Sequence, residues 1–257
     1  MSLDADIAAC AALVARGDPP RFRAAMAAPV ALRRMLLPLY AFNLEVARAP
    51  WVTKEQLIAL MRLQWWRDAL GEIAEGKPVR RHEVVTPLAA VLDPKGARAL
   101  DDAVAARERD LDAEPPADVA ELLAHVDRTA GTLLWTAARL AGAEDEAAAR
   151  DAGRAQGAAN LLLAVPELVK RGRHPLPHGD PAEHAAALAE EGLAALGRFR
   201  AARVPKEARP VFLVLPEAEA ALRRIARDPA SVVDPAPADL PLGTRLSIGW
   251  RAALNRP

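Results

Sequence analysis

Apolar residues recur at steps of three and four along most of this sequence, which is the spacing of one face of an α-helix. The pattern is clearest over residues 53–74, where Leu57, Leu60, Met61 and Trp65 alternate with charged residues of the opposite face. Alanine, leucine, arginine and glutamate dominate, and all four are strong helix formers. Aromatic residues are only 4% of the chain, and the period-two pattern of strands is almost absent. The sequence therefore predicts an all-α protein.

Prolines and glycines divide the chain into helical segments. We expect helices over residues 4–16, 21–27, 30–48, 53–74, 83–92, 95–112, 118–141, 143–170, 182–202 and 207–227. Pro38 either kinks the third helix or divides it in two. Residues 171–181 are predicted to form a loop, and the proline-rich residues 228–242 an extended segment before a short closing helix. No repeat or shift in composition marks a boundary, so we expect a single domain over residues 1–257.

Charge and cysteine content exclude several classes of protein. Lys plus Arg and Asp plus Glu both number 34, and a chain of zero net charge is a poor candidate for general nucleic-acid binding. The single cysteine, Cys10, can form neither an intramolecular disulfide nor a thiolate metal cluster. Asp4 and Asp6 precede a short apolar run, unlike the basic start of a signal peptide, and no run approaches the roughly 20 apolar residues of a membrane span. We expect a cytoplasmic protein with at most peripheral membrane contact.

Four stretches carry a family resemblance. Residues 19–45 read PPRFRAAMAAPVALRRMLLPLYAFNLE, and residues 60–70 read LMRLQWWRDAL. Residues 155–177 contain an Ala-Gln-Gly helix and a Leu-Pro exit loop, and residues 130–132 form an Ala-Gly-Thr turn. In this order and spacing they resemble the squalene/phytoene synthase family over roughly residues 20–225. The resemblance implies an isoprenoid synthase-type helical bundle with a central cavity.

The family condenses two allylic diphosphates, and the resemblance implies two helices that each carry aspartates at i and i+4 to hold Mg²⁺. Counting from Tyr40-Ala41-Phe42 places the first pair at positions 47 and 51. Counting from Asn160 and from the Leu-Pro loop places the second pair at positions 164 and 168. The residues at these four positions are Ala47, Trp51, Ala164 and Leu168. All four carboxylates that the resemblance implies are therefore missing.

Neighbouring acids do not replace them. Glu45 precedes the first expected acid by two residues, about 200° around a helix, and Glu167 precedes the last by one, about 100° away. Leu44 stands where the resemblance implies an arginine, and His125 where it implies a tyrosine. One or two misplaced acids cannot supply the near-octahedral oxygen coordination of Mg²⁺. We therefore expect no metal site, no cofactor and no prenyl transfer activity.

The segment Ala41-Phe42-Asn43-Leu44-Glu45, with residues 60–67, is most similar to one branch of the family. That branch contains the mitochondrial assembly factor of respiratory complex I and its alphaproteobacterial relatives, which lack the acid motifs. The resemblance implies a non-catalytic role in building complex I at the cytoplasmic face of the inner membrane. Complex I subunits and an isoprenoid or lipid are then the candidate partners.

A cavity that remains from the family's active site would be lined by polar and aromatic side chains. The candidates are Tyr40, Phe42, Asn43, Glu45, Gln64, Trp65, His125, Gln156 and Asn160. Core packing of the aromatic residues is an equally simple interpretation, and Gln156 and Asn160, four residues apart, could instead form a buried amide pair between helices. Trp65 and Trp66 point about 100° apart on a helix, so at least one of them belongs to the core.

Two basic clusters lie where the family handles diphosphate. Their residues are Arg33, Arg34, Lys170, Arg171 and Arg173. They either bind a phosphate or an anionic headgroup or are simply solvated. His174 and His178 are spaced like a metal-binding pair, but Pro175 and Pro177 prevent a helix between them, so no metal is expected there.

Three hypotheses follow. The first is a non-catalytic member of the family that binds a lipid or a protein partner and assists complex I assembly. The second is a prenyltransferase that holds Mg²⁺ with unconventional ligands, and it requires at least three converging carboxylates. The third is a helical scaffold with a filled core and no ligand. The hypotheses differ in whether a cavity exists and in whether acids converge in it.

Overall fold

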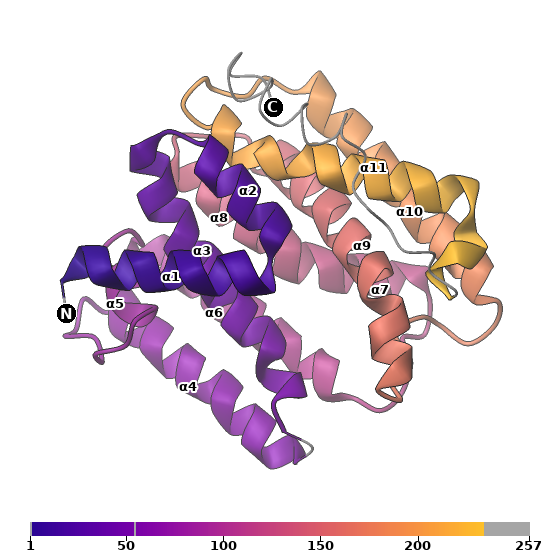
Figure 1. Cartoon of the computed structure of the whole chain (residues 1–257), viewed down its shortest axis with the longest axis horizontal. Helices are drawn as coiled ribbons and strands as arrows, with labels where there is room; N and C mark the ends of the chain where they lie inside the picture. Colours follow the sequence, from indigo (N-terminus) through magenta and orange to yellow (C-terminus); the bar gives the residue numbers. More distant parts are fainter. Residues whose placement is uncertain (1, 54, 234–257) are drawn as a thin grey trace.

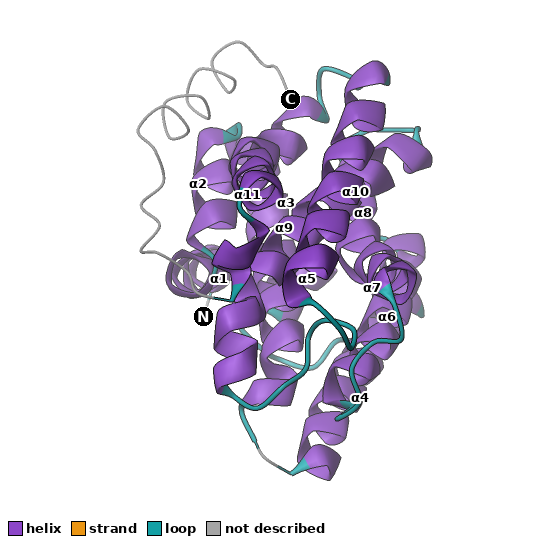
Figure 2. Cartoon of the chain, turned by 90° about the vertical axis from the view of Figure 1, so that its right-hand side faces the viewer, coloured by secondary structure: helices purple, strands orange, loops and turns teal. Residues whose placement is uncertain are grey.

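The computed structural model describes residues 2–53 and 55–233 (Figure 1). Within these residues the elements are helices and no strand is present, which confirms the all-α prediction (Figure 2). The α-helices are α1 (Leu3–Gly17), α2 (Pro19–Ala27), α3 (Val30–Arg48), α4 (Gln56–Ala74), α5 (Val85–Ala89), α6 (Pro94–Ala106), α7 (Val119–Val126), α8 (Thr132–Leu140), α9 (Glu146–Lys170), α10 (Pro181–Ala201) and α11 (Leu215–Arg227). Short 3-10 turns are η1 (Ala49–Trp51), η2 (Arg107–Leu111), η4 (Arg209–Val214) and η5 (Pro229–Val232), and η3 (Asp127–Gly131) is a π-helical turn.

Side-chain oxygens begin many of these helices by accepting a hydrogen bond from a backbone N–H of the first turn. The capping residues are Ser2, Asp18, Asp93, Asp118, Asp145 and Asp180. At α4 the structure differs from the expected start at Thr53. The Thr53 Oγ1 accepts from the nearby N–H of Glu55 at 3.1 Å, and α4 begins only at Gln56.

Pro38 lies inside α3, which continues through it as one helix from Val30 to Arg48. Proline removes one backbone hydrogen bond at this point. Leu36, Leu37 and Leu39 beside it are almost completely buried. Burial of this apolar segment offsets the missing bond, so the helix is not divided.

The segment expected as one helix over residues 118–141 contains the π turn η3 between α7 and α8. The Thr129 hydroxyl donates to the carbonyl oxygen of His125 at 2.7 Å. The expected helix over 95–112 ends as the 3-10 turn η2, and the one over 207–227 begins as η4. Only the first residues of the expected extended segment 228–242 are described, as η5, and the expected closing helix lies outside the described residues.

The long helix α9 packs against α7, α8, α10, α11 and η3, so it lies at the centre of the arrangement (Figures 1 and 2). Its buried residues are mostly alanines and glycines, and small side chains allow neighbouring helices to approach closely. On the other side of the molecule α4 packs on α6, and α1 packs on α3. In the described part of the chain, no helix combines the length and the hydropathy that a bilayer span requires.

Candidate functional site

A cavity of about 560 Å³ opens between α3, α7, η3 and the second half of α9. The segments 17–21, 107–116 and 173–175 complete its wall. Its volume is that of a small-molecule site. Asn160 and Leu163 line the cavity and are exposed, so it communicates with solvent.

All four positions at which the family resemblance implies carboxylates lie in the wall of this cavity. They are Ala47 on α3, Trp51 in η1, and Ala164 and Leu168 on α9. Each pair is four residues apart and so occupies one helical face. The counting from sequence motifs therefore reached positions in the cavity wall, and the side chains at these positions are apolar.

Other carboxylates do line the cavity, and they come mainly from η2 and the residues after it. They are Asp18, Asp110, Asp112, Glu114 and Glu121. Asp110 contacts Arg107 at 3.1 Å and the Nε2 of His125 at 3.0 Å. The Nε of Arg109 lies 2.8 Å from Glu121, and its Nη1 lies 3.2 Å from Asp112. Among the described residues, no group of three or more His, Cys, Asp and Glu side chains is arranged to hold a metal ion.

The pKa values of two of these acids, Asp110 and Glu121, are lowered by their partners. Burial raises the pKa of Asp110, but the charge of Arg107 and the hydrogen bond from His125 outweigh it, so the net shift is downward. The N–H of Ala117 and the guanidinium of Arg109 lower the pKa of Glu121. The sequence reasoning missed this group of residues. The spacing of Arg107 with Asp110 and of Arg109 with Asp112 was the available signal, since residues three apart on a helix can pair.

Arg21 is the most buried charged residue of the cavity wall, with 4% of its surface exposed. Its guanidinium donates to Asp18 at 2.6 Å and to the Oε1 of Gln156 at 3.2 Å, and it lies 5.5 Å from the centre of the Tyr40 ring. Burial raises the pKa of the Tyr40 hydroxyl. Gln156 therefore links α9 to α2 through Arg21, whereas Asn160 is exposed, so the two amides do not form a buried pair. Tyr40 and Gln156 lie behind the cavity wall, whereas Arg21 is part of it.

Of the other residues predicted to line the cavity, some do so and the rest lie elsewhere in the structure. Asn43, His125 and Asn160 line the cavity. Phe42 does not, because it packs edge-to-face on Trp66 with ring centres 5.4 Å apart. Glu45 is not among the residues that line the cavity, and it lies 3.6 Å from Arg48.

Gln64 and Trp65 also lie outside the cavity, contrary to expectation. The Nε2 of Gln64 donates to Asp68 at 2.7 Å on the exposed face of α4. Trp65 packs on Trp66 and His82. The reason is the rotation of α4, whose buried face carries Ala59, Leu63, Trp66, Ala69, Leu70 and Ile73.

The two basic clusters lie at opposite ends of α3. Arg33 donates to the carbonyl oxygen of Ala28 at 3.0 Å, and Arg34 lies 2.7 Å from Asp4. Arg171 and Arg173 instead stack over Trp51, 5.9 and 5.4 Å from its ring centre. Eighteen residues of helical rise separate Arg33 from Trp51, about 27 Å. Of the five basic candidates Arg173 lines the cavity, and Lys170 is exposed at the end of α9.

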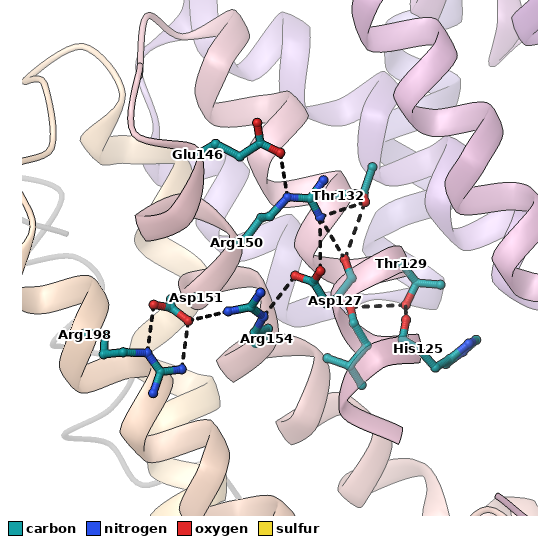
Figure 3. Close-up of polar contacts among 10 residues, drawn as sticks. His125, Asp127, Thr129, Thr132, Glu146, Arg150, Asp151, Arg154 and Arg198 are labelled. Atoms are coloured by element: carbon teal, nitrogen blue, oxygen red, sulfur yellow. Dashed lines mark hydrogen bonds and ion pairs between the residues drawn. The ribbon is translucent and has the colours of Figure 1, made fainter. Parts of the chain in front are cut away.

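A network of ion pairs fixes the π turn beside the cavity (Figure 3). Asp127 accepts from Arg154 at 3.0 Å, and Arg154 also donates to Asp151 at 2.8 Å. Asp151 in turn accepts two hydrogen bonds from Arg198 of α10, at 2.9 and 3.0 Å. Arg150 bridges Glu146 and the π turn. The network joins η3, α9 and α10, and so holds the wall segment that carries Thr129 and Ala130.

Comparison with known proteins defines the class of protein that has this fold and cavity. The model of the squalene/phytoene synthase family matches residues 14–184, about two thirds of the chain. The chain therefore belongs to the squalene/phytoene synthase family. The fold is similar to that of a dehydrosqualene synthase, with a TM-score of 0.71 at 17% identity over 98% of this chain and 96% of that one. It is also similar to the squalene synthase HpnC from Alicyclobacillus acidocaldarius, with a TM-score of 0.72 at 17% identity over 88% and 94% of the two chains. The isoprenoid synthase-type fold is thus confirmed.

Within this family, the similar curated proteins are complex I assembly factors, as the resemblance in sequence predicted. The chain is 26% identical to "NADH dehydrogenase (ubiquinone) complex I, assembly factor 6" of Rattus norvegicus, over 85% of this chain and 73% of the rat protein. It is 32% identical to the homologue of that factor in Drosophila melanogaster, over 61% of this chain and 50% of the fly protein. The human factor is 28% identical over 61% and 48%. The matches thus span about half the length of the fly and human proteins.

Proposed function

We propose that this protein is a non-catalytic member of the squalene/phytoene synthase family that binds an isoprenoid or other lipid chain in its cavity and takes part in assembly of respiratory complex I. One observation carries the proposal. The four cavity positions at which family resemblance implies metal-binding aspartates hold Ala47, Trp51, Ala164 and Leu168. Without such ligands a diphosphate leaving group lacks the cations that would neutralise it as its bond to carbon breaks.

The cavity wall supports binding of a chain rather than of a metal–diphosphate complex. Trp51, Leu161, Leu163, Ala164 and Leu168 form an apolar side along η1 and α9. The charged part of the wall contains acids that are paired with arginines of the same chain. A ligand with an apolar chain and a small polar end matches this division.

The role in complex I assembly is supported by the relatives, which carry that function in their names. It is tested by deleting the gene in the native host and following assembled complex I on native gels. We expect less assembled complex I, restored by the wild-type gene. Normal amounts of the complex in the deletion strain would contradict this part of the proposal.

The alternative of a prenyltransferase with unconventional ligands has one specific observation in its favour, the five carboxylates that line the cavity. In that case Mg²⁺ would have to displace Arg107, Arg109 and His125 from Asp110, Asp112 and Glu121. The energetic cost of leaving partly buried arginines without partners disfavours this reaction. A ligand-free scaffold remains the third candidate.

A calorimetric titration separates the three hypotheses. Farnesyl diphosphate, geranylgeranyl diphosphate and uncharged farnesol are titrated with Mg²⁺ and with a chelator, and the same samples are analysed for pyrophosphate and products. We expect binding that Mg²⁺ changes by less than about threefold, with no pyrophosphate released. Metal-dependent binding with turnover would identify a prenyltransferase. Absence of binding would favour the scaffold.

A cavity-filling variant provides the matched control. Ala164→Trp places an indole in the cavity, and Val30→Trp adds the same group at a surface position that is 65% exposed. We expect the first substitution to weaken farnesol binding at least about tenfold and the second to leave it unchanged. Equal binding by both variants would show that the ligand lies elsewhere.

A further inference from the structure

Trp51 lies in the cavity wall at a position where family resemblance implies a carboxylate. Two guanidinium groups stack over its indole, those of Arg171 and Arg173, with the Cζ atoms 5.9 and 5.4 Å from the ring centre. Both arginines directly follow α9, which ends at Lys170. Trp51 therefore lies at the C-terminal end of α9, the end of the cavity to which Leu168 belongs.

Arg173 joins three segments at this end of the cavity. Its Nη1 donates to the carbonyl oxygens of Leu111 and Asp112, at 3.3 and 3.2 Å, while its guanidinium stacks on Trp51. The end of η2, the end of η1 and the loop after α9 thus meet at one side chain. The planar guanidinium is restrained both by its hydrogen bonds and by the aromatic ring, so Arg173 supports the indole from one side.

A second depression, of about 400 Å³, adjoins the cavity here. Pro50 and Thr53, which flank Trp51 in the sequence, line this depression. Arg173 and His174 line both spaces, whereas Trp51 lines the cavity. The two spaces are therefore adjacent, and Arg173 with the indole stacked on it belongs to the partition between them.

The cavity extends along α9 towards this partition. Gly157, Leu161, Ala164 and Leu168 line it, at spacings of three and four residues that place them on one face of the helix. Gly157 and Leu168 are eleven residues apart, about 16 Å of helical rise. An apolar chain that lies along this face meets Trp51 at the Leu168 end of the cavity.

We infer that Trp51, supported by Arg173, is the end wall of the cavity and sets the longest isoprenoid chain that the cavity accepts. The inference rests on the proposed function, because it assigns a limit to the chain that is bound there. Each further apolar group that leaves water strengthens binding, so a closed cavity has a chain length beyond which the affinity no longer rises. Removal of the indole joins the cavity to the second depression and moves this limit to longer chains.

Calorimetric titration of the full chain with geraniol, farnesol and geranylgeraniol tests the end wall, because each alcohol is one isoprene unit longer than the one before. Trp51→Ala removes the indole, and Leu168→Trp adds bulk at the same end of the cavity. Trp65→Ala is the matched control. Trp65 is also half-buried and has an arginine 5.0 Å from its ring centre, but it lies outside the cavity. Thermal melts verify that each variant is folded.

We expect Trp51→Ala to bind geranylgeraniol at least about tenfold more tightly than wild type does, and geraniol within about threefold. Leu168→Trp should act in the opposite direction and weaken binding of farnesol, relative to geraniol, at least about tenfold. Trp65→Ala should bind all three alcohols within about twofold of wild type, because it leaves the end wall in place.

Two results would overturn the end wall and leave the cavity function intact. One is a wild-type affinity that rises steadily from geraniol to geranylgeraniol. The other is a Trp51→Ala variant whose affinities for the three alcohols all change by the same factor. A folded wild-type chain that binds none of the alcohols would instead refute the proposed function, and the end wall with it.

Discussion

At the scale of single residues, Asp151 illustrates how one carboxylate joins two helices. It is 7% exposed and binds both Arg154 and Arg198. Burial raises its pKa, but the hydrogen bonds from the two guanidinium groups prevail and the pKa is lowered. We expect Asp151→Asn to lower the free energy of unfolding by about 2 kcal/mol, because both arginines lose a charged partner. Urea titration at neutral pH measures the change. Glu167→Gln, which removes an exposed pair with Arg171, should change it by less than about 0.5 kcal/mol.

The same residue predicts a dependence on pH. Since the pKa of Asp151 is lower in the folded chain than in the unfolded one, its contribution is complete above the unfolded pKa. The contribution is lost as the pH falls through the folded pKa. Wild type and Asp151→Asn should therefore differ most in urea midpoint near neutral pH and converge in acid, once the pH lies below the lowered pKa of the folded chain. A difference in urea midpoint that persists unchanged in acid would show that the ionised Asp151 carboxylate is not the source of this stability.

At the scale of elements, the contact of α9 with the π turn depends on a missing side chain. A Cβ at Gly153 would lie 2.6 Å from the Cα of Gly131 and 2.7 Å from the carbonyl oxygen of Ala130. Both neighbours are backbone atoms, so the helices would have to separate. We expect Gly153→Ala to destabilise the protein by about 2–3 kcal/mol and to weaken the proposed binding of farnesol, because Ala130 lines the cavity.

Gly197 in α10 provides the control for this prediction. A Cβ there meets no heavy atom within 4 Å. Alanine is the better helix former, so Gly197→Ala should stabilise the protein by about 0.5–1 kcal/mol. Thermal melts of both variants give the comparison. Equal shifts in the same direction would show that backbone entropy, and not the close approach to the π turn, decides the effect at Gly153.

At the scale of the whole molecule, one buried apolar cluster extends from Cys10 to Val232. It includes Trp66 of α4 and Trp135 of α8. We predict a single cooperative unfolding transition, with coincident urea midpoints by far-UV circular dichroism and by tryptophan fluorescence. Coincidence would support the single domain expected from sequence. Two separated transitions would show that the chain contains more than one cooperative unit.

Much of the molecule could be predicted from local patterns. Alanine- and leucine-rich segments with a three- to four-residue repeat specify helices, and α3 has the bounds expected for it. Counting from Tyr40-Ala41-Phe42 and from Asn160 located four residues of the cavity wall. The count succeeds because residues four apart in a helix lie on the same face. Local patterns could not place Glu45, Gln64 or Trp65, since the face that each helix buries depends on its neighbours.

Sequence by itself determined the helical class, the family and the apolar residues at positions 47, 51, 164 and 168, because these follow from residue identity and spacing along one chain. The tertiary structure alone decided which side chains share a space. It paired Arg21 with Gln156, 135 residues away, and it separated the two basic clusters to opposite ends of α3. It also placed the acids of η2 in the cavity wall beside arginines of the same turn. The physical reason is that such contacts arise from packing between distant segments, where rotation of a helix by one residue, about 100°, changes every neighbour.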